Sequence, residues 1–381
     1  MTFDGAESHR GDFFVAEMAY SQIRLKILPS VRCLFDKMVQ VKVEGLAPHK
    51  QVQLRSKLVD DRGVIFKASA LYKADETGQV DVYRAPSLGG SYTGVEPMGL
   101  FWALAPETPH SKLLKKNVLS PTLVEIEALS GETGEVLASE TNERQYMTEG
   151  MKRIPVQEGR IRGVLFVPPG YCGFSQPLEA VSYLRRQPEV KGPGIGIIAI
   201  SHSGGLALSM SSFLSGISAT VCINGCNANT VIPLHYKDIV IPPLPPVMKN
   251  IKITESGLVD IRDALPDPSL EKNRASLIPI ERASCQFLFA VSEDDHNWNS
   301  VFFAKQAAAT LRNHGKESFK VVTYPKAGHF LEVPHMPYCS SGFHGAVGSD
   351  VVFGGEPKAH SEAQLDLWEK VQEFFKSHLD N

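Results

Sequence analysis

The sequence has no cysteine pattern that would build a metal site or a disulfide framework. Its six cysteines form no Cys-x-x-Cys pair and no finger-like spacing: Cys33, Cys172, Cys222, Cys226, Cys285 and Cys339. The first residues do not resemble a secretory signal, so nothing indicates an oxidising compartment. We therefore expect reduced thiols in an intracellular protein, with no metal ligands among them.

The chain also lacks an excess of charge of either sign. Its 39 Lys and Arg residues nearly balance 42 Asp and Glu residues, which leaves a formal net charge of −3. This balance is ordinary for a globular protein and gives no basic surface for nucleic acid. The one basic cluster, at Lys112, Lys115 and Lys116, is interpreted first as a solvated face and second as a ligand contact.

No segment has the length and apolar character that a membrane span needs. Residues 194–229 contain no Asp, Glu, Lys or Arg, but His202, Asn224 and many Gly and Ser residues interrupt the run. A spanning helix needs about 20 mostly apolar residues. The run instead fits a strand, a helix and a second strand buried on both faces of a parallel sheet.

The two ends of the sequence lack the usual targeting patterns. The start, "MTFDGAESHRGDFF", has early acidic residues and no apolar core, unlike a signal or transit peptide. The end, "KSHLDN", differs from a peroxisomal Ser-Lys-Leu tail. We therefore expect a cytoplasmic location.

Length and pattern together predict two domains. A chain of 381 residues exceeds one ordinary core. Residues 1–20 look like a loose leader. Residues 21–150 alternate apolar and polar side chains, as at 39–46 and 52–60, and contain a predicted hairpin around 131–134. This pattern predicts a β-sandwich with a structural or gating role.

The pattern changes over residues 151–381. An apolar strand at 194–200 is followed by helical spacing, and later apolar strands end at acidic and histidine-bearing loops. Further helical patterns cover 177–187 and 363–379. Strands alternating with helices predict a mainly parallel α/β sheet.

Three chemically useful residues follow three of these strands. A serine comes after the strand at 194–200, Asp295 follows a later strand, and His329 follows the last one. The order Ser, Asp, His is that of the α/β-hydrolases, in which a histidine activates a serine and a carboxylate orients the histidine. Two serines compete for the first place, Ser201 and Ser203, and local sterics at a tight turn slightly favour Ser203.

Several long motifs carry a family resemblance from about residue 21 to the end. They are "SLGGSYTGVEPMGLFWAL", "GRIRGVLFVPPG", "QPEVKGPGIGIIAIS", "LSMSSFLSGISATVCING", "EDDHNW", "YPKAGHF" and "FGGEPKAH". The chain thereby resembles the type I acyl-CoA thioesterases and bile acid-CoA:amino acid N-acyltransferases. The resemblance implies an N-terminal immunoglobulin-like β-sandwich and a C-terminal α/β-hydrolase domain.

The resemblance also implies site residues and a reaction. The register of the "LSM" helix places the nucleophile at Ser201, with Ser203 as the alternative, and the acid and base fall on Asp295 and His329. The implied reaction is hydrolysis of a fatty acyl-CoA, in which coenzyme A is part of the substrate and no separate cofactor is needed. The alternatives are transfer of the acyl group to glycine or taurine, and a catalytically weak relative that binds a ligand.

One departure from the family lies upstream of the serine. Only "YCGFSQ" separates Gly170 from Pro177. By resemblance, roughly sixty residues are absent there, about two strand–helix units. In this fold, a loop after the early strands supplies one N–H of the oxyanion hole. We therefore expect an opened sheet and impaired chemistry.

Overall fold

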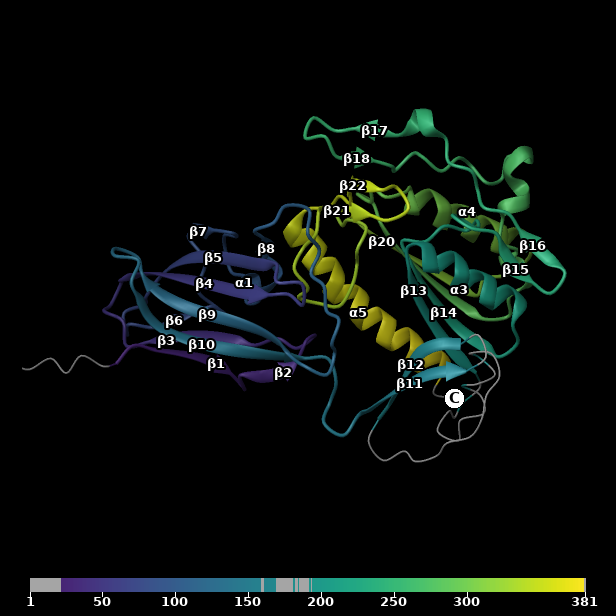
Figure 1. Ribbon diagram of the computed structural model, residues 1–381. Coiled ribbons are helices and arrows are strands. Elements are labelled where there is room, and N and C mark those ends of the chain that lie inside the picture. The colour runs from purple at the N-terminus through teal and green to yellow at the C-terminus, as the bar shows by residue number, and fades with distance from the viewer. Residues whose placement is uncertain are drawn as a thin grey trace, which may run out of the picture.

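The computed structural model describes residues 22–158, 161–168, 181, 184, 192 and 194–379 (Figure 1). A β-rich region formed by the earlier part of the chain lies beside an α/β region formed by the later part (Figure 1). The predicted leader at 1–20 and most of the predicted helix at 177–187 lie outside the described residues. The domain boundary at residue 150 stays a prediction.

The N-terminal region is a β-sandwich of two sheets. Three strands pair in the order β1–β3–β6, and the second sheet runs β2–β10–β9–β4–β5–β7 with β8 also on β5. Alternate residues of both sheets, such as Val41 and Leu54, meet in one apolar core. The strands are β1 (Arg24–Leu28), β2 (Arg32–Leu34), β3 (Gln40–Glu44), β4 (Gln51–Val59), β5 (Ile65–Lys73), β6 (Val80–Asp81), β7 (Gly89–Gly90), β8 (Ala105–Pro106), β9 (Thr122–Ser130) and β10 (Val136–Gln145), with the short helix α1 (Gly99–Trp102) between β7 and β8.

The C-terminal region is built on four parallel strands in the order β13–β14–β19–β20. These are β13 (Ile195–Ile200), β14 (Ile217–Ile223), β19 (Gln286–Ser292) and β20 (Phe319–Tyr324). Helices α3 (His202–Phe213) and α4 (Ser300–Asn313) pack on one face, and the long α5 (Pro357–Leu379) covers the other (Figure 1). The alternating strands and helices confirm the predicted mainly parallel α/β architecture.

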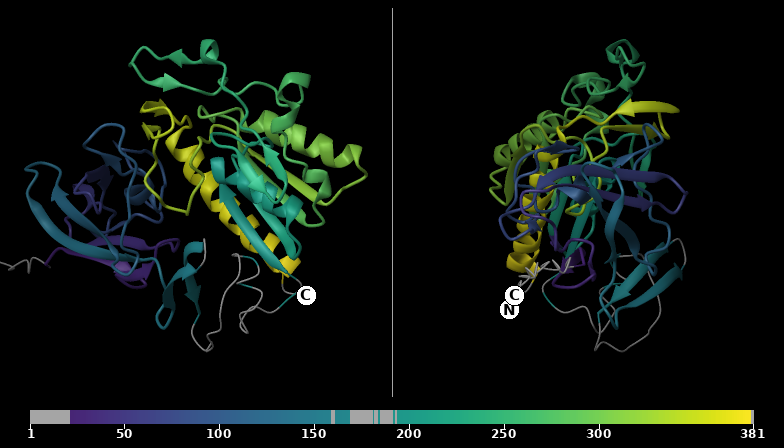
Figure 2. Two further views of the ribbon diagram at one scale, coloured as in Figure 1. Left: turned by 45° about the vertical axis from the view of Figure 1, so that its right-hand side comes forward. Right: turned by 90° about the vertical axis from the view of Figure 1, so that its left-hand side faces the viewer.

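Smaller elements surround this sheet, and the sequence patterns did not predict them. Strands β15 (Leu234–Tyr236) and β16 (Ile239–Ile241) form a hairpin, and an outer sheet runs β17–β18–β22–β21. The outer sheet lies above the C-terminal end of the main sheet (Figure 2). Its strands are β17 (Lys252–Ile253), β18 (Val259–Asp260), β21 (Ser341–His344) and β22 (Ser349–Val352), and single 3₁₀ turns lie at Met248–Asn250, Glu271–Ser276 and Ile280–Arg282.

Strand β13 lies at an open edge of the main sheet. Among the described strands it pairs with β14 alone, whereas β11 (Lys152–Glu158) and β12 (Ile161–Val167) pair only with each other. Ile198, in the middle of β13, is 49% exposed. Among the described residues, no strand lies on the other side of β13, and the middle of this strand is open.

Polar contacts join the two regions. Lys112 of the sandwich pairs with Glu332 at 2.5 Å, and Lys358 of α5 pairs with Glu96 at 2.6 Å. The indole of Trp368 donates to Asp36 over 3.2 Å. Lys112 is therefore engaged between the regions, although its side chain keeps a third of its surface exposed.

The described residues contain no helix both long and apolar enough to cross a lipid bilayer.

Candidate active site

Ser201 lies at a strained turn between β13 and α3. Its backbone has φ 59° and ψ −133°, a conformation that non-glycine residues rarely adopt. The turn is held because the Ser201 amide donates to Ile223 O over 2.9 Å and Gly204 N donates to Ser201 O over 2.9 Å. Strain of this kind, kept in place by surrounding bonds, is concentrated at functional sites.

Glycines make the turn possible. A Cβ on Gly204 would lie 2.9 Å from the Cys222 sulfur and 3.0 Å from Gly225 Cα. A Cβ on Gly225 would lie 2.4 Å from the same sulfur. The start of α3 can therefore approach the end of β14 only with glycine at both positions.

The structure brings the predicted serine, histidine and aspartate into one chain of hydrogen bonds. The Ser201 hydroxyl donates to His329 Nε2 over 2.7 Å, and His329 Nδ1 donates to Asp295 Oδ2 over 2.9 Å. Ser201 follows β13, His329 follows β20 and Asp295 follows β19. The three residues therefore meet at the carboxyl edge of the sheet. This geometry lets the histidine accept the serine proton while the carboxylate fixes its tautomer.

The Asp295 carboxylate is fully buried and saturated with donors. Its Oδ1 accepts from the Asn297 amide at 2.8 Å, and its Oδ2 also accepts from the Ser300 hydroxyl. Asp294 points elsewhere and accepts from the Gly355 amide at 2.7 Å. The two adjacent aspartates thus differ in role, and only Asp295 contacts the histidine.

Ser203, the alternative nucleophile, makes different contacts. Its hydroxyl donates to Ile200 O over 2.6 Å and accepts from Ile200 N at 3.2 Å. Among the described residues no hydrogen bond joins it to His329. Its hydroxyl is therefore engaged with the backbone at the end of β13.

Two residues that the sequence analysis did not assign to the site hold the histidine loop. His360 on α5 accepts from Gly328 N at 3.1 Å and donates to Phe330 O over 2.9 Å. Burial lowers the pKa of His360 to about 4, so the ring is neutral and can accept on one side and donate on the other. The only signal in the sequence was its place in the family-like "FGGEPKAH" motif.

Asn224 is the second such residue. It follows β14, and its side chain donates to His329 O over 2.7 Å and accepts from Ser292 N at 2.7 Å. Its own carbonyl accepts from the indole of Trp298 at 2.7 Å. Asn224 therefore ties the ends of two strands to the histidine loop. A polar residue directly after a buried strand was the available signal in the sequence, and the sequence analysis did not use it.

Arg262 braces the acid loop from the outer sheet. Its guanidinium donates to Asp295 O over 2.7 Å and to Glu293 O over 3.1 Å. His296 bridges Asp260 at 2.8 Å and Asp294 at 3.2 Å. The described residues contain no group of three or more His, Cys, Asp or Glu side chains placed to hold a metal ion.

A serine at a strained turn, then an aspartate, then a histidine, all at the carboxyl edge of one parallel sheet, is the chain order of the α/β-hydrolases. The C-terminal region is an α/β-hydrolase domain, and the N-terminal region is an immunoglobulin-like β-sandwich. Residues 178–381 match the family "BAAT / Acyl-CoA thioester hydrolase C terminal", and residues 36–158 match "Acyl-CoA thioester hydrolase/BAAT N-terminal region". The chain belongs to this acyl-CoA thioester hydrolase/BAAT family.

Curated relatives are similar over nearly the whole chain. Acyl-coenzyme A thioesterase 1 of Rattus norvegicus is 42% identical over 406 residues, covering 93% of this chain and 96% of the relative. The human protein of the same name is 41% identical over 402 residues, covering 92% and 96%. Acyl-coenzyme A thioesterase 2, mitochondrial, of Rattus norvegicus is 42% identical over 412 residues, covering 95% and 90%.

The alignment lengths also show that the relatives contain residues that this chain lacks. The alignment with the first relative is 406 positions long. This chain contributes 93% of its 381 residues to it, about 354. About 50 positions of the relative therefore have no counterpart in this chain. The number is close to the roughly sixty residues that the family resemblance leads us to expect after Gly170.

Proposed function

We propose that the protein hydrolyses fatty acyl-CoA to a free fatty acid and coenzyme A. Relatives at 40–42% identity are named acyl-coenzyme A thioesterases. The observation that carries the proposal is the hydrogen-bond chain from Ser201 through His329 to Asp295. It provides a nucleophile, a general base and an orienting carboxylate for acyl transfer from a thioester.

Each residue then has a defined step. Ser201 Oγ attacks the thioester carbonyl while its proton passes to His329 Nε2. The tetrahedral intermediate collapses, the C–S bond breaks, and the sulfur leaves as the thiol with the proton from His329. Water attacks the acyl-serine, giving its proton to the same nitrogen, and the fatty acid leaves as Ser201 regains its proton. Asp295 stabilises the imidazolium in both halves of the reaction.

The oxyanion of each intermediate needs N–H donors. The amide of His202, the first residue of α3, is the donor that follows directly from the turn. The donor that the fold normally takes from a loop after the early strands falls in the missing stretch. Because loss of one donor typically costs roughly 10²–10³ in rate, we propose a slower enzyme than its full-length relatives.

Hydrolysis and N-acyl transfer differ in the molecule that accepts the acyl group. With water as acceptor the product is a fatty acid, and with glycine or taurine it is an N-acyl amino acid. Product analysis of oleoyl-CoA turnover with and without these amino acids decides between them. We expect the fatty acid in both cases, and an N-acyl product would replace the proposed hydrolase with an N-acyltransferase.

A pair of neighbouring variants tests the nucleophile. Ser201→Ala should abolish thiol release from acyl-CoA, because it removes the hydroxyl bonded to His329. Ser203→Ala is the matched control and should keep most of the activity, because its hydroxyl bonds only to the backbone of Ile200 among the described residues. Full activity in Ser201→Ala would transfer the assignment to Ser203.

A further inference from the structure

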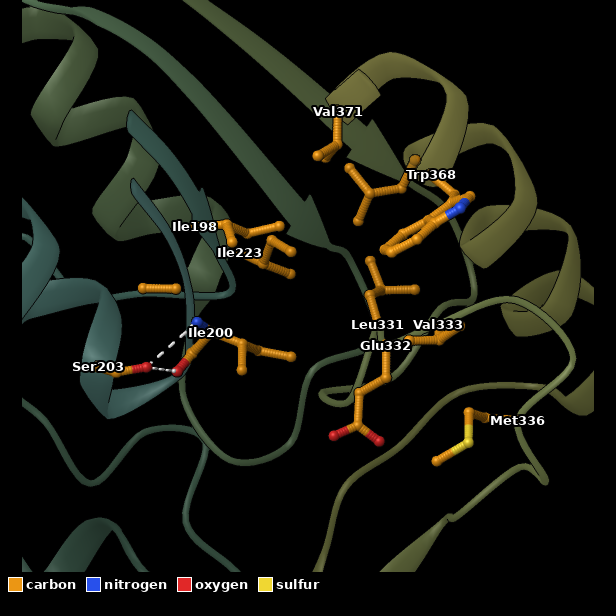
Figure 3. Close-up of a pocket in the computed structure, with 12 residues that line it drawn as sticks. Ile198, Ile200, Ser203, Ile223, Leu331, Glu332, Val333, Met336, Trp368 and Val371 are labelled. Carbon is orange, nitrogen blue, oxygen red and sulfur yellow. Dashed lines mark hydrogen bonds between the residues drawn. The ribbon is translucent and has the colours of Figure 1, made fainter. Parts of the chain in front are cut away.

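An apolar groove lies along β13, beside the edge that has no described partner. It has a volume of about 380 Å³ and runs between β13, α5 and the loop that follows His329 (Figure 3). Its apolar lining includes Ile198 and Ile200 of β13, Leu331 of the loop, and Leu367 and Val371 of α5. The volume lies within the range of about 300–1,000 Å³ that small-molecule sites occupy.

The groove lies beside the side of β13 that has no described partner. Parallel strands are normally covered on both faces, and an exposed isoleucine in the middle of one is unusual. Ile198 is 49% exposed, and no described strand pairs with that side of β13. Among the described residues, its side chain is therefore available to a ligand.

One end of the groove reaches the candidate active site. Ile200 and Ser203, which both line the groove, flank Ser201 in the chain. Leu331, on the opposite wall, is two residues after His329. Figure 3 shows Ser203 and Leu331 on facing sides of the opening. A molecule lying in the groove would thus have one end beside Ile200 and Ser203, the lining residues on either side of Ser201 in the chain.

We propose that this groove holds the acyl chain of the thioester substrate, with the carbonyl end at Ser201. The inference rests on the function proposed above and adds the place where the chain binds. An alkyl chain binds through apolar contacts and makes no hydrogen bonds, and the walls of the groove are mostly apolar. Glu332 is the one charged residue of the lining, and its carboxylate is neutralised by Lys112 at 2.5 Å.

Two tryptophans allow a direct test. Trp368 lines the groove (Figure 3), whereas Trp298 lies 5.7 Å from the His329 ring, centroid to centroid. The probe is a non-hydrolysable S-alkyl coenzyme A thioether that carries bromine, a fluorescence quencher, at the far end of its chain. We expect saturable quenching of Trp368, and loss of that component in Trp368→Phe. A probe brominated next to the sulfur should quench Trp298 instead.

A blocking variant tests the groove by turnover. Ile198→Trp places a large ring in the groove from its exposed side. It should raise the ratio of KM for palmitoyl-CoA to KM for butyryl-CoA about tenfold, the effect of leaving about two methylene groups in water. Leu123→Trp is the matched control, since Leu123 is an equally exposed apolar residue (53%) on β9 of the sandwich. It should leave the ratio unchanged.

The outcomes separate this inference from the proposed function. If the protein does not hydrolyse acyl-CoA but the probe still quenches Trp368, the proposed function is wrong and the groove remains a site for the alkyl chain. Hydrolysis with Trp368 unquenched and an unchanged KM ratio in Ile198→Trp would reject the groove and keep the function. If Ile198→Trp instead converts a dimer to a monomer in light scattering, and Trp368 is not quenched, a second copy occupies the groove and the proposal is wrong.

Discussion

The two regions differ in how their sheet edges are protected. In the sandwich, edge strand β1 carries Arg24 and Lys26, and edge strands β6 and β7 are only two residues long. Charges and short strands are ordinary protection against unwanted pairing. Edge strand β13, with the sequence IGIIAI, has six residues and no charge. Its sequence is that of an interior strand now at an edge.

The hydrogen bonds among Ser201, His329 and Asp295 form although β13, the strand before Ser201, is an edge of the described sheet. The turn at Ser201, the acid loop and the histidine loop all lie on the β13–β14–β19–β20 side and keep their mutual hydrogen bonds. The proposed function assigns the proton-moving groups to these loops. The oxyanion donor that it expects from a loop after the early strands is not found among the described residues.

The largest effect should come from the aspartate that orients the histidine. Asp295→Asn should lower kcat for thiol release about 10⁴-fold, as in serine proteases, because an amide favours the wrong histidine tautomer. Asp294→Asn is the matched control and should change kcat little, since Asp294 bonds to His296 and Gly355. Equal losses in both variants would remove Asp295 from the mechanism.

Restoring the missing stretch tests the comparison between the regions directly. A version with the relatives' residues inserted after Gly170 should melt at a higher temperature, because the edge of β13 gains a partner and Ile198 is covered. Its kcat for a long-chain acyl-CoA should rise by at least roughly 10²-fold through the regained oxyanion donor. Thermal melting and thiol release on the matched pair measure both. Equal melting points and equal rates would show that the short connection is accommodated.

The sequence predicted the parts of this molecule that local pattern controls. Parallel strands such as β13 and β19 have continuous apolar sequences, and the candidate site residues Ser201 and Asp295 follow them within three residues. Helix α5 begins at Pro357 rather than at the predicted 363, because its first turn, "PKAHSE", lacks apolar periodicity. Proline at the first helical position was the available signal for that start.

The parts that depend on distant contacts were not predictable in this way. Strands β15 to β18 have two or three residues each and are fixed by pairing, not by alternation. Asn224 and His360 bond to the histidine loop, which lies 105 and 32 residues away from them in the chain. A choice between Ser201 and Ser203 needed the family register, since local sterics slightly favoured the serine that does not contact His329.

A pH effect should follow from His360. Its pKa falls from the ordinary 6.5 to about 4 on folding, so between these values the unfolded chain binds more protons. Stability is therefore complete above about pH 6.5 and falls as the pH drops towards 4, by up to about 3 kcal/mol for this group. His360→Gln keeps an acceptor for Gly328 N and a donor for Phe330 O but does not titrate. Urea unfolding between pH 4 and pH 7 should show a shallower decline in the variant.

His335 provides the internal reference for that experiment. Burial lowers its pKa to about 4 as well, so it contributes the same acid sensitivity to both proteins. The difference between the two pH profiles therefore isolates His360. Parallel profiles would mean that His360 is not the neutral, buried group described above.

The smallest effect concerns the contact that links the sandwich to the histidine loop. Lys112 pairs with Glu332 and lies 4.0 Å from the centroid of the Phe330 ring, next to His329. Because the pair is partly exposed, Lys112→Met should cost no more than about 1 kcal/mol of unfolding free energy. The exchanged pair Lys112→Glu with Glu332→Lys should recover part of that loss, whereas either single reversal places like charges together. A double-mutant cycle by urea unfolding measures the coupling, and a coupling of zero would mean that the sandwich does not hold this loop through Lys112.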